Sequence, residues 1–154
     1  RVGILYVFAE EIGATRIGVG HYRDDIVETM FLNMFYGSKM SSMPPKLLSD
    51  DKRNIVIRPM AYCKESDLEK FAQVKDFPII PCNLCGTQEN MTRQKIKQLI
   101  HDLAGDNPKI PGNILAAMGN ISPRQLMDHN HFEFIGLEEV LIDAAQAIDL
   151  LKQE

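Results

Sequence analysis

Apolar side chains near the start of the chain follow helical spacing. Ile4, Phe8 and Ile12 fall on one face of a helix, and Gly13 then marks its end. We therefore expect an amphipathic helix over 3–13, with its apolar face covering a sheet. The next segment, 15–20, has β-forming residues at its centre and ends in glycine, which predicts a strand that runs into a loop.

The following segment is apolar nearly all the way round a helix. Its run of apolar residues between Ile26 and Phe35 predicts a buried helix over 24–36. Glycine, serine and paired proline then replace this periodicity over 37–53, which predicts a loop of about 17 residues. Loops of that length inside a domain are usually functional or mobile.

Helical and strand periodicity continue to alternate along the rest of the chain. Ser66 and Glu69 match a capping box, which predicts that a helix begins at about Asp67. The other predicted elements are strands over 54–59 and 77–80, helices over 67–74 and 87–104, two weaker helical pieces after Gly105, and an acidic helix over 137–151. This alternation predicts βαβ crossovers and hence an α/β fold with a parallel sheet.

The number of predicted strands is low for such a fold. Only three are credible, whereas a doubly wound sheet usually has about five, with a glycine-rich ligand-binding turn at its amino end. We interpret 1–104 as part of an incomplete α/β domain and 105–154 as a helical C-terminal extension.

Composition narrows the class of protein. A length of 154 residues suits one domain, and 45% apolar with 25% charged residues is typical of a globular chain. The apolar stretches fall far short of the roughly 20 residues that cross a bilayer, and the first residues do not resemble a secretory signal. Three cysteines are too few for a secreted disulfide scaffold, so we expect a cytoplasmic protein with no membrane partner.

The formal net charge of −4 is unevenly spread. Six basic and two acidic residues over 39–64 give that segment a local charge of +4, which is compatible with binding a phosphate backbone. Scattered lysines more often form a merely solvated face. The candidate nucleic-acid contacts are Lys39, Lys46, Lys52, Arg53, Arg93, Lys95 and Lys97.

The densest polar cluster lies where the 15–20 strand meets the buried helix. Ligands of open α/β sheets bind outside the carboxyl ends of strands, and Gly20 would let a nucleotide approach the backbone closely. Asp24 and Asp25 beside a phosphate would need a cation, and Mg²⁺ typically binds through one or two carboxylates plus phosphate oxygens.

A simpler interpretation treats the same cluster as ordinary helix-start chemistry. Asp24 would then be the N-cap, Asp25 a favourable first-turn acid and His21 a surface loop residue. Glu28 and Thr29 weigh against it, because they sit on the first turn of an otherwise apolar helix and burying a carboxylate without a partner is costly.

Several stretches together carry a family resemblance. They are GHYRDDIVETMFLNMFYG at 20–37, MPPKLLSDD at 43–51, IVIRP at 55–59, AYC at 61–63 and PIIPCNLCG at 78–86. In these stretches the chain resembles the tRNA 2-thiocytidine biosynthesis enzymes, which are PP-loop ATPases with a Rossmann-like fold. The resemblance runs in register over about 1–134 and thins after Gly105, and the predicted helix over 137–151 has no counterpart.

The resemblance implies an ATP-dependent sulfur transfer to tRNA. The oxygen at C2 of a cytidine in the anticodon loop would be adenylated and then displaced by sulfur, with AMP leaving. Gly20 and His21 would line the adenylate, and Asp24 or Asp25 would help to hold Mg²⁺. Arg58 would approach the nucleotide phosphates or the tRNA, although from the residues alone it could equally be a snorkelling side chain.

Cys82 and Cys85 form a single C-x-x-C pair, which by itself fits zinc, iron–sulfur or redox roles equally. The resemblance implies a [4Fe-4S] cluster held by three cysteines, of which Cys85 is the first choice here and Cys82 the reserve. One iron would remain open to carry the attacking sulfur, supplied by a cysteine desulfurase-type donor. Cys63 is expected to be a small buried hydrophobe. The oligomeric state is left open, a homodimer included.

Two motifs of the family do not occur in this sequence. They are the Ser-Gly-Gly-Lys-Asp-Ser pyrophosphate loop and a further cysteine pair. We therefore interpret the chain as the carboxyl half of such an enzyme, inactive alone, in which the Gly20 turn and the cysteine loop face a common cavity. Two alternatives remain. One is a lysidine-synthase-like adenylating ligase, which would not need the cysteines, and the other is a non-catalytic metal- or tRNA-binding module.

Overall fold

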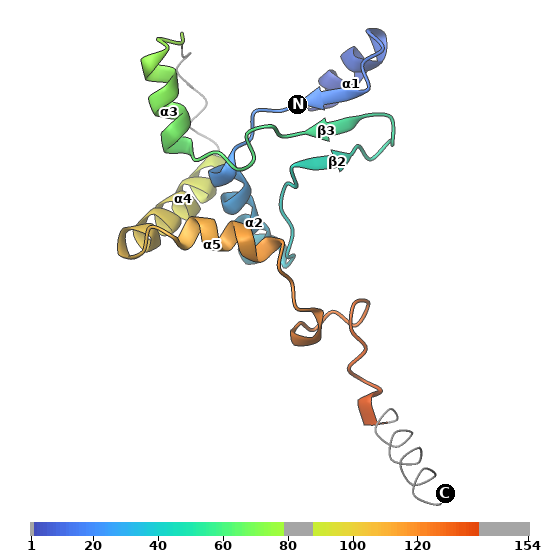
Figure 1. The fold of residues 1–154 in the computed structure, drawn as a ribbon. Coiled ribbons are helices and arrows are strands. Elements are labelled where there is room, and N and C mark those ends of the chain that lie inside the picture. The colour runs from blue at the N-terminus through green and yellow to red at the C-terminus, as the bar shows by residue number, and fades with distance from the viewer. Residues whose placement is uncertain (1, 79–87, 139–154) are drawn as a thin grey trace, which may run out of the picture. The chain divides into compact units, whose positions relative to one another are not determined.

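The computed structural model describes residues 2–78 and 88–138. Its internal contacts divide the chain into two units, Arg1–Ala116 and Ala117–Glu154. The first unit holds a small sheet and five helices among the described residues (Figure 1). The second holds the short 3₁₀ helix Pro123–Gln125, and Leu137 and Glu138 begin a further helix. The rest of the predicted helix over 137–151 lies outside the described residues.

Three short strands form the sheet, in the order β1-β3-β2. β1 (Arg16–Gly18) pairs in parallel with β3 (Ile55–Ile57), and β2 (Lys46–Leu48) pairs with β3 in the antiparallel direction. Ile17 lies opposite Val56, and both side chains are buried. The predicted α/β class is therefore confirmed, but the sheet is mixed and not purely parallel.

β2 lies inside 37–53, the segment that the sequence predicts to be a loop. Its three residues, Lys-Leu-Leu, do not alternate between apolar and polar, so periodicity could not reveal them. A tight turn joins β2 to β3, in which the Ser49 N–H donates to the Asn54 carbonyl at 2.9 Å. Asn54 is buried, and its side-chain amide donates to the Ala14 carbonyl at 2.9 Å. This asparagine thus ties the turn to the chain that leads into β1.

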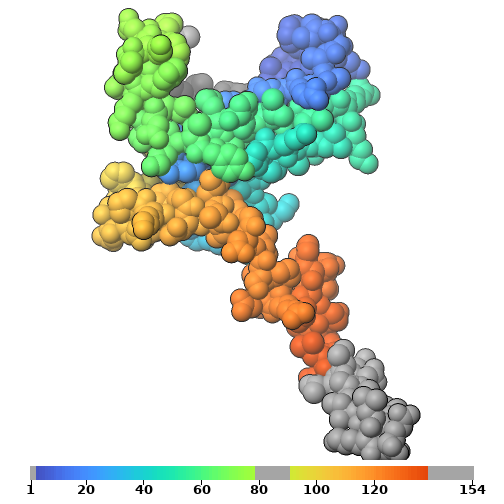
Figure 2. Space-filling view, viewed as in Figure 1, coloured from blue at the N-terminus to red at the C-terminus, as the bar shows by residue number. Residues whose placement is uncertain are grey.

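The first helix, α1 (Val2–Glu11), forms as predicted, and Gly13 follows with a φ of 68°. The expectation that its apolar face covers the sheet holds only at Ala9, which is buried. Ile4, Phe8 and Ile12 are 78%, 55% and 61% exposed. In Figure 2 the blue surface of α1 lies beside the green and teal surface of the strands.

The second helix, α2 (Arg23–Gly37), extends one residue beyond the prediction at each end. Ile26, Val27 and Glu28 are buried, but Phe35 and Tyr36 are more than half exposed. The prediction of a fully buried helix is therefore wrong for its last turn. The helix ends where Ser38 adopts a left-handed conformation, with a φ of 48°.

The later helices are α3 (Glu65–Val74), α4 (Gln88–Asp106) and α5 (Ile110–Met118). α4 packs beside α2, and Ile96 and Ile100 form its buried stripe (Figure 1). Of the predicted strand over 77–80, Phe77 and Pro78 are not in a strand, and the other two residues lie outside the described part of the chain. Among the described residues, no helix combines the length and apolar character needed to span a bilayer.

Candidate functional site

The site lies at the carboxyl ends of β1 and β3. Because these strands are parallel and paired in register from Arg16 with Ile55 to Gly18 with Ile57, the residues that follow them emerge at the same edge. The Val19 N–H continues the pairing by donating to the Ile57 carbonyl at 3.0 Å. The structure thus brings the Gly20 turn and Arg58 together, although they lie far apart in the sequence.

Three features of this edge suit a ligand. Gly20 is exposed, and a Cβ built on it would meet only the Met60 side chain at 3.7 Å, so packing among the described residues does not require glycine there. The Nδ1 atom of His21 is buried and has no hydrogen-bond partner in the described part of the chain. The Nε atom of Arg58 is also buried and has no hydrogen-bond partner among the described residues. Buried polar nitrogens without partners are costly, and a bound anion or heterocycle would satisfy them.

The other contacts of Arg58 fix its direction. Its Nη1 donates to the Pro44 carbonyl at 2.6 Å, and its backbone N–H donates to the Pro45 carbonyl at 2.8 Å. Burial lowers the pKa of the guanidinium, and the nearby Tyr6 opposes that shift. An arginine remains charged after such a shift, so the site keeps a fixed positive group beside the Gly20 turn.

The start of α2 is organised differently from the simple N-cap interpretation. The N-cap is Tyr22, and its backbone N–H donates to the Asp25 carboxylate at 3.2 Å. Asp25 is thus the first-turn acid, and its second oxygen lies 4.0 Å from Arg93.

Asp24 has a role that sequence reasoning missed. One of its oxygens pairs with the Arg23 guanidinium at 2.9 Å, and the other accepts the Glu65 N–H at 2.8 Å. Glu65 is the first residue of α3, so Asp24 caps a helix that begins 41 residues later in the chain. The prediction that α3 begins at about Asp67 with Ser66 as its cap is therefore wrong. No local signal could have revealed a cap supplied from another helix.

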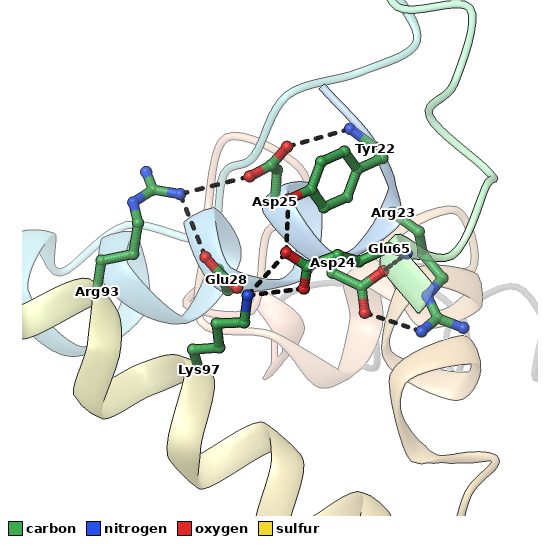
Figure 3. Close-up of polar contacts among 8 residues, drawn as sticks. All are labelled: Tyr22, Arg23, Asp24, Asp25, Glu28, Glu65, Arg93 and Lys97. Carbon is green, nitrogen blue, oxygen red and sulfur yellow. Dashed lines mark hydrogen bonds and ion pairs between the residues drawn. The ribbon is translucent and has the colours of Figure 1, made fainter. Parts of the chain in front are cut away.

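A cluster of acidic and basic side chains surrounds this helix start (Figure 3). The Glu65 carboxylate accepts a hydrogen bond from the Tyr22 hydroxyl at 2.8 Å and pairs with Lys97 at 2.7 Å. The buried Glu28 carboxylate pairs with Arg93 at 3.3 Å. We call Tyr22, Glu28, Glu65, Arg93 and Lys97 the α2–α4 polar cluster.

The cluster shifts the titration of its members. Burial raises the pKa of Glu28, and Lys97 and Arg93 oppose the shift without cancelling it. Burial and the hydrogen bond to Glu65 raise the pKa of Tyr22 well above its usual range. Burial works against the Lys97 ammonium, but its hydrogen bond to Glu65 and the surrounding carboxylates outweigh burial and raise its pKa.

The two aspartates differ in how well they fit Mg²⁺. Both oxygens of Asp24 are already engaged, whereas one Asp25 oxygen has only the longer contact to Arg93. Within 2–78 and 88–138, no three His, Cys, Asp or Glu side chains gather as a metal site. Mg²⁺ needs only one or two carboxylates when phosphate supplies the other oxygens, so Asp25 fits that role better.

The cysteines are placed unequally. Cys82 and Cys85 lie outside the described residues, as does the cavity expected between them and the Gly20 turn. Cys63 is exposed, so the prediction of a buried hydrophobe is wrong. It lies in a turn whose backbone is held inward, since its N–H donates to the Met60 carbonyl and its carbonyl accepts the Arg23 N–H.

The candidate nucleic-acid contacts fall into two groups. Arg93, Lys97 and Arg53 are ion-paired, the last with Glu10 at 2.9 Å. The others have exposed side chains without ion pairs to any described residue; they are Lys39, Lys46, Lys52 and Lys95. The prediction that these seven residues contact nucleic acid is not tested by the structure.

Comparisons with known proteins identify the relatives. No family model matches the chain. The tRNA-cytidine(32) 2-sulfurtransferase of Cellvibrio japonicus is 59% identical over 89% of this chain and 45% of its own length. The enzyme of the same name from Alcanivorax borkumensis is 58% identical over 90% of this chain and 49% of its own length. The one from Coxiella burnetii CbuG_Q212 is 55% identical over 87% of this chain and 52% of its own length.

The chain is homologous to the tRNA-cytidine(32) 2-sulfurtransferases. It spans about half the length of these curated relatives, and the family resemblance predicted from the sequence is confirmed. Among solved structures, the U34-tRNA thiolase NcsA from Methanococcus maripaludis with its [4Fe-4S] cluster matches with a TM-score of 0.60. It shares 17% identity over 77% of this chain and 40% of its own, which supports a common PP-loop-type α/β fold.

Proposed function

We propose that this chain forms part of an enzyme that replaces the C2 oxygen of an anticodon-loop cytidine in tRNA with sulfur. The observation that carries the proposal is the identity of 55–59% to three tRNA-cytidine(32) 2-sulfurtransferases over about nine-tenths of the chain. In the proposed reaction the C2 oxygen takes up AMP from ATP with release of pyrophosphate. Sulfur then forms a bond to C2, and the C2–O bond breaks as AMP leaves with that oxygen.

The edge at Gly20 and Arg58 is the proposed nucleotide site. The open backbone at Gly20 and the unsatisfied His21 nitrogen would receive the adenylate, and Arg58 would face its phosphates. Asp25 is the better placed carboxylate for Mg²⁺, and Asp24 would act by fixing the start of α3 against the turn. These roles refine the prediction, in which either aspartate could hold the metal.

The proposed sulfur chemistry uses a [4Fe-4S] cluster, with Cys85 as its first candidate ligand in this chain and Cys82 as the reserve. A bound cluster would supply an iron that carries the attacking sulfur. The NcsA match supports this proposal through its fold. tRNA is the proposed substrate, a cysteine desulfurase-type system the proposed source of sulfur and the cytoplasm the proposed location. A homodimer remains a prediction.

The test is tRNA thiolation by the intact protein that carries this sequence, supplied with ATP, Mg²⁺ and a sulfur source and assayed by mass spectrometry of the digested nucleosides. We expect 2-thiocytidine from the unmodified protein and none after Cys82→Ser with Cys85→Ser. Thiolation that survives loss of both cysteines would contradict the cluster mechanism. Adenylation without thiolation in the unmodified protein would favour the ligase alternative.

Asp24 and Asp25 can be separated in the same assay. Asp25→Asn should weaken the Mg²⁺ dependence of ATP binding, because it removes the charge nearest the proposed metal. Asp24→Asn keeps an oxygen for the Glu65 N–H and should leave that dependence nearly unchanged. An equal effect of both substitutions would contradict the assignment of Asp25.

A further inference from the structure

The α2–α4 polar cluster joins three elements that are far apart in the sequence. Tyr22 and Glu28 belong to the start of α2, Glu65 begins α3, and Arg93 and Lys97 lie one turn apart on α4. Figure 3 shows both basic side chains reaching from α4 toward the carboxylates of the other two helices. The start of α2 is also the turn that presents Gly20 and His21, so the cluster adjoins the proposed nucleotide site.

Burial of Glu28 indicates that the contact does more than add stability. Its side chain is 8% exposed and its partner Arg93 is 43% exposed. An apolar residue of similar size would avoid the cost of desolvating a carboxylate, so a buried ion pair is weak support for stability alone. A charged pair does have a demanding geometry, and it can fix how two packed helices are aligned.

The charged pairs add directional contacts to the apolar packing of α4. Ile96 and Ile100 bury one stripe of α4, and an aliphatic contact is non-directional. Arg93 and Lys97 lie beside the same stripe, at helical spacing, and reach separate carboxylates on α2 and α3. The Arg93–Glu28 pair and the Lys97–Glu65 pair together constrain how α4 is rotated about its axis and how far it is shifted along that axis.

We propose that Arg93 and Lys97 are positioning residues that align α4 with the nucleotide turn, so that nucleotide binding at the turn is transmitted through Glu28 and Glu65 to the start of α4. The inference rests on the proposed function, since it takes the Gly20 turn as the nucleotide site. It assigns neither residue to direct contact with nucleotide or tRNA.

The test is backbone hydrogen exchange of the intact protein with and without ATP and Mg²⁺. In the unmodified protein, ATP should slow exchange in the first half of α4 by about tenfold, the size expected when two modest ion pairs are reinforced. Arg93→Gln with Lys97→Gln should still bind ATP and should lose the slowing in α4, because α4 no longer pairs with Glu28 and Glu65. Arg93→Lys with Lys97→Arg keeps a positive charge at both positions and should retain most of the ATP-dependent slowing in α4.

Lys70→Gln provides the control, because Lys70 is an exposed lysine of α3 that forms no ion pair with a described residue. Its exchange response should match the unmodified protein. If the double variant fails to fold, Glu28→Gln removes the partner on α2 while leaving α4 unchanged. It should weaken the response, and the remaining pair between Lys97 and Glu65 should keep part of it. An ATP response in α4 that persists in the double variant, or that is absent from an unmodified protein that binds ATP, would overturn the inference alone. Failure of the unmodified protein to bind ATP would overturn the proposed nucleotide site as well.

Discussion

The carboxylate of Asp24 accepts a 2.8 Å hydrogen bond from the backbone N–H of Glu65, 41 residues further along the chain. One side chain near the start of α2 therefore satisfies the first free donor of α3. This contact makes the placement of α3 depend on the turn that carries the candidate nucleotide site, and it leads to a prediction about stability.

Asp24→Ala should lower the free energy of unfolding by about 1 kcal/mol, which is typical for loss of a helix cap. Asp24→Asn should cost less, since its amide oxygen can still accept the Glu65 N–H. Urea unfolding followed by circular dichroism measures both. If the two variants lose the same stability, the pairing with Arg23 outweighs the cap.

Glu28 should make the protein less stable as the pH rises above the ordinary glutamate pKa of 4.5. Burial raises its pKa in the folded state, so between the two values the folded state binds a proton that the unfolded state has lost. The stability contributed by protonated Glu28 is complete below 4.5 and is lost as the pH rises through the raised value. Glu28→Gln should remove this part of the slope in urea midpoints measured from pH 4 to 8, and an unchanged slope would exclude Glu28 as its source.

Tyr22 should ionise only well above the usual tyrosine pKa of 10.0. Burial and its hydrogen bond to the Glu65 carboxylate disfavour the phenolate, so its pKa lies above the usual 10.0. Titration by ultraviolet absorbance should show a late step that Tyr22→Phe removes. The same substitution should cost about 1 kcal/mol of stability through loss of one hydrogen bond. Retention of the late step in the variant would assign it to another tyrosine.

Asn54→Ala should destabilise the protein by about 1–3 kcal/mol, because it leaves the partly buried Ala14 carbonyl without its donor. The neighbouring Arg53→Ala is the matched control. Its ion pair with Glu10 is about two-thirds exposed on each side, so its loss should change stability by less than about 1 kcal/mol. Thermal unfolding of the two variants should therefore differ clearly, and equal losses would contradict the role of Asn54.

Sequence periodicity predicts the elements that are long enough to show a repeating apolar pattern, above all α1 and α2. The predicted bounds of α1 and α2 agree with the structure to within two residues, and Gly20 and Arg58 each lie at the end of a predicted strand. That the two strands pair in parallel and bring these residues to one edge comes from the structure. Strand β2 was missed because three residues are too short to show alternation.

The remaining differences come from contacts between distant residues. The cap on α3 comes from Asp24, and the basic side chains of α4 find acidic partners on α2 and α3. The sequence predicts Arg93 and Lys97 as nucleic-acid contacts, and the structure adds that both are half exposed and paired with Glu28 and Glu65. Spacing along one sequence carries no signal for such pairings. The family resemblance rests on motifs that do not include Glu65 or Lys97, so it could not predict the contacts of these two residues.

The exposed apolar side of α1 has a practical consequence for anyone who handles these 154 residues. Ile4, Phe8 and Ile12 face water, and an apolar surface of this kind attracts other apolar surfaces and hydrophobic dyes. Solutions of the chain should become turbid or bind such dyes more strongly as concentration increases. Spectroscopic and binding measurements on it are best made over a dilution series, with Phe8→Glu as the variant that should stay clear.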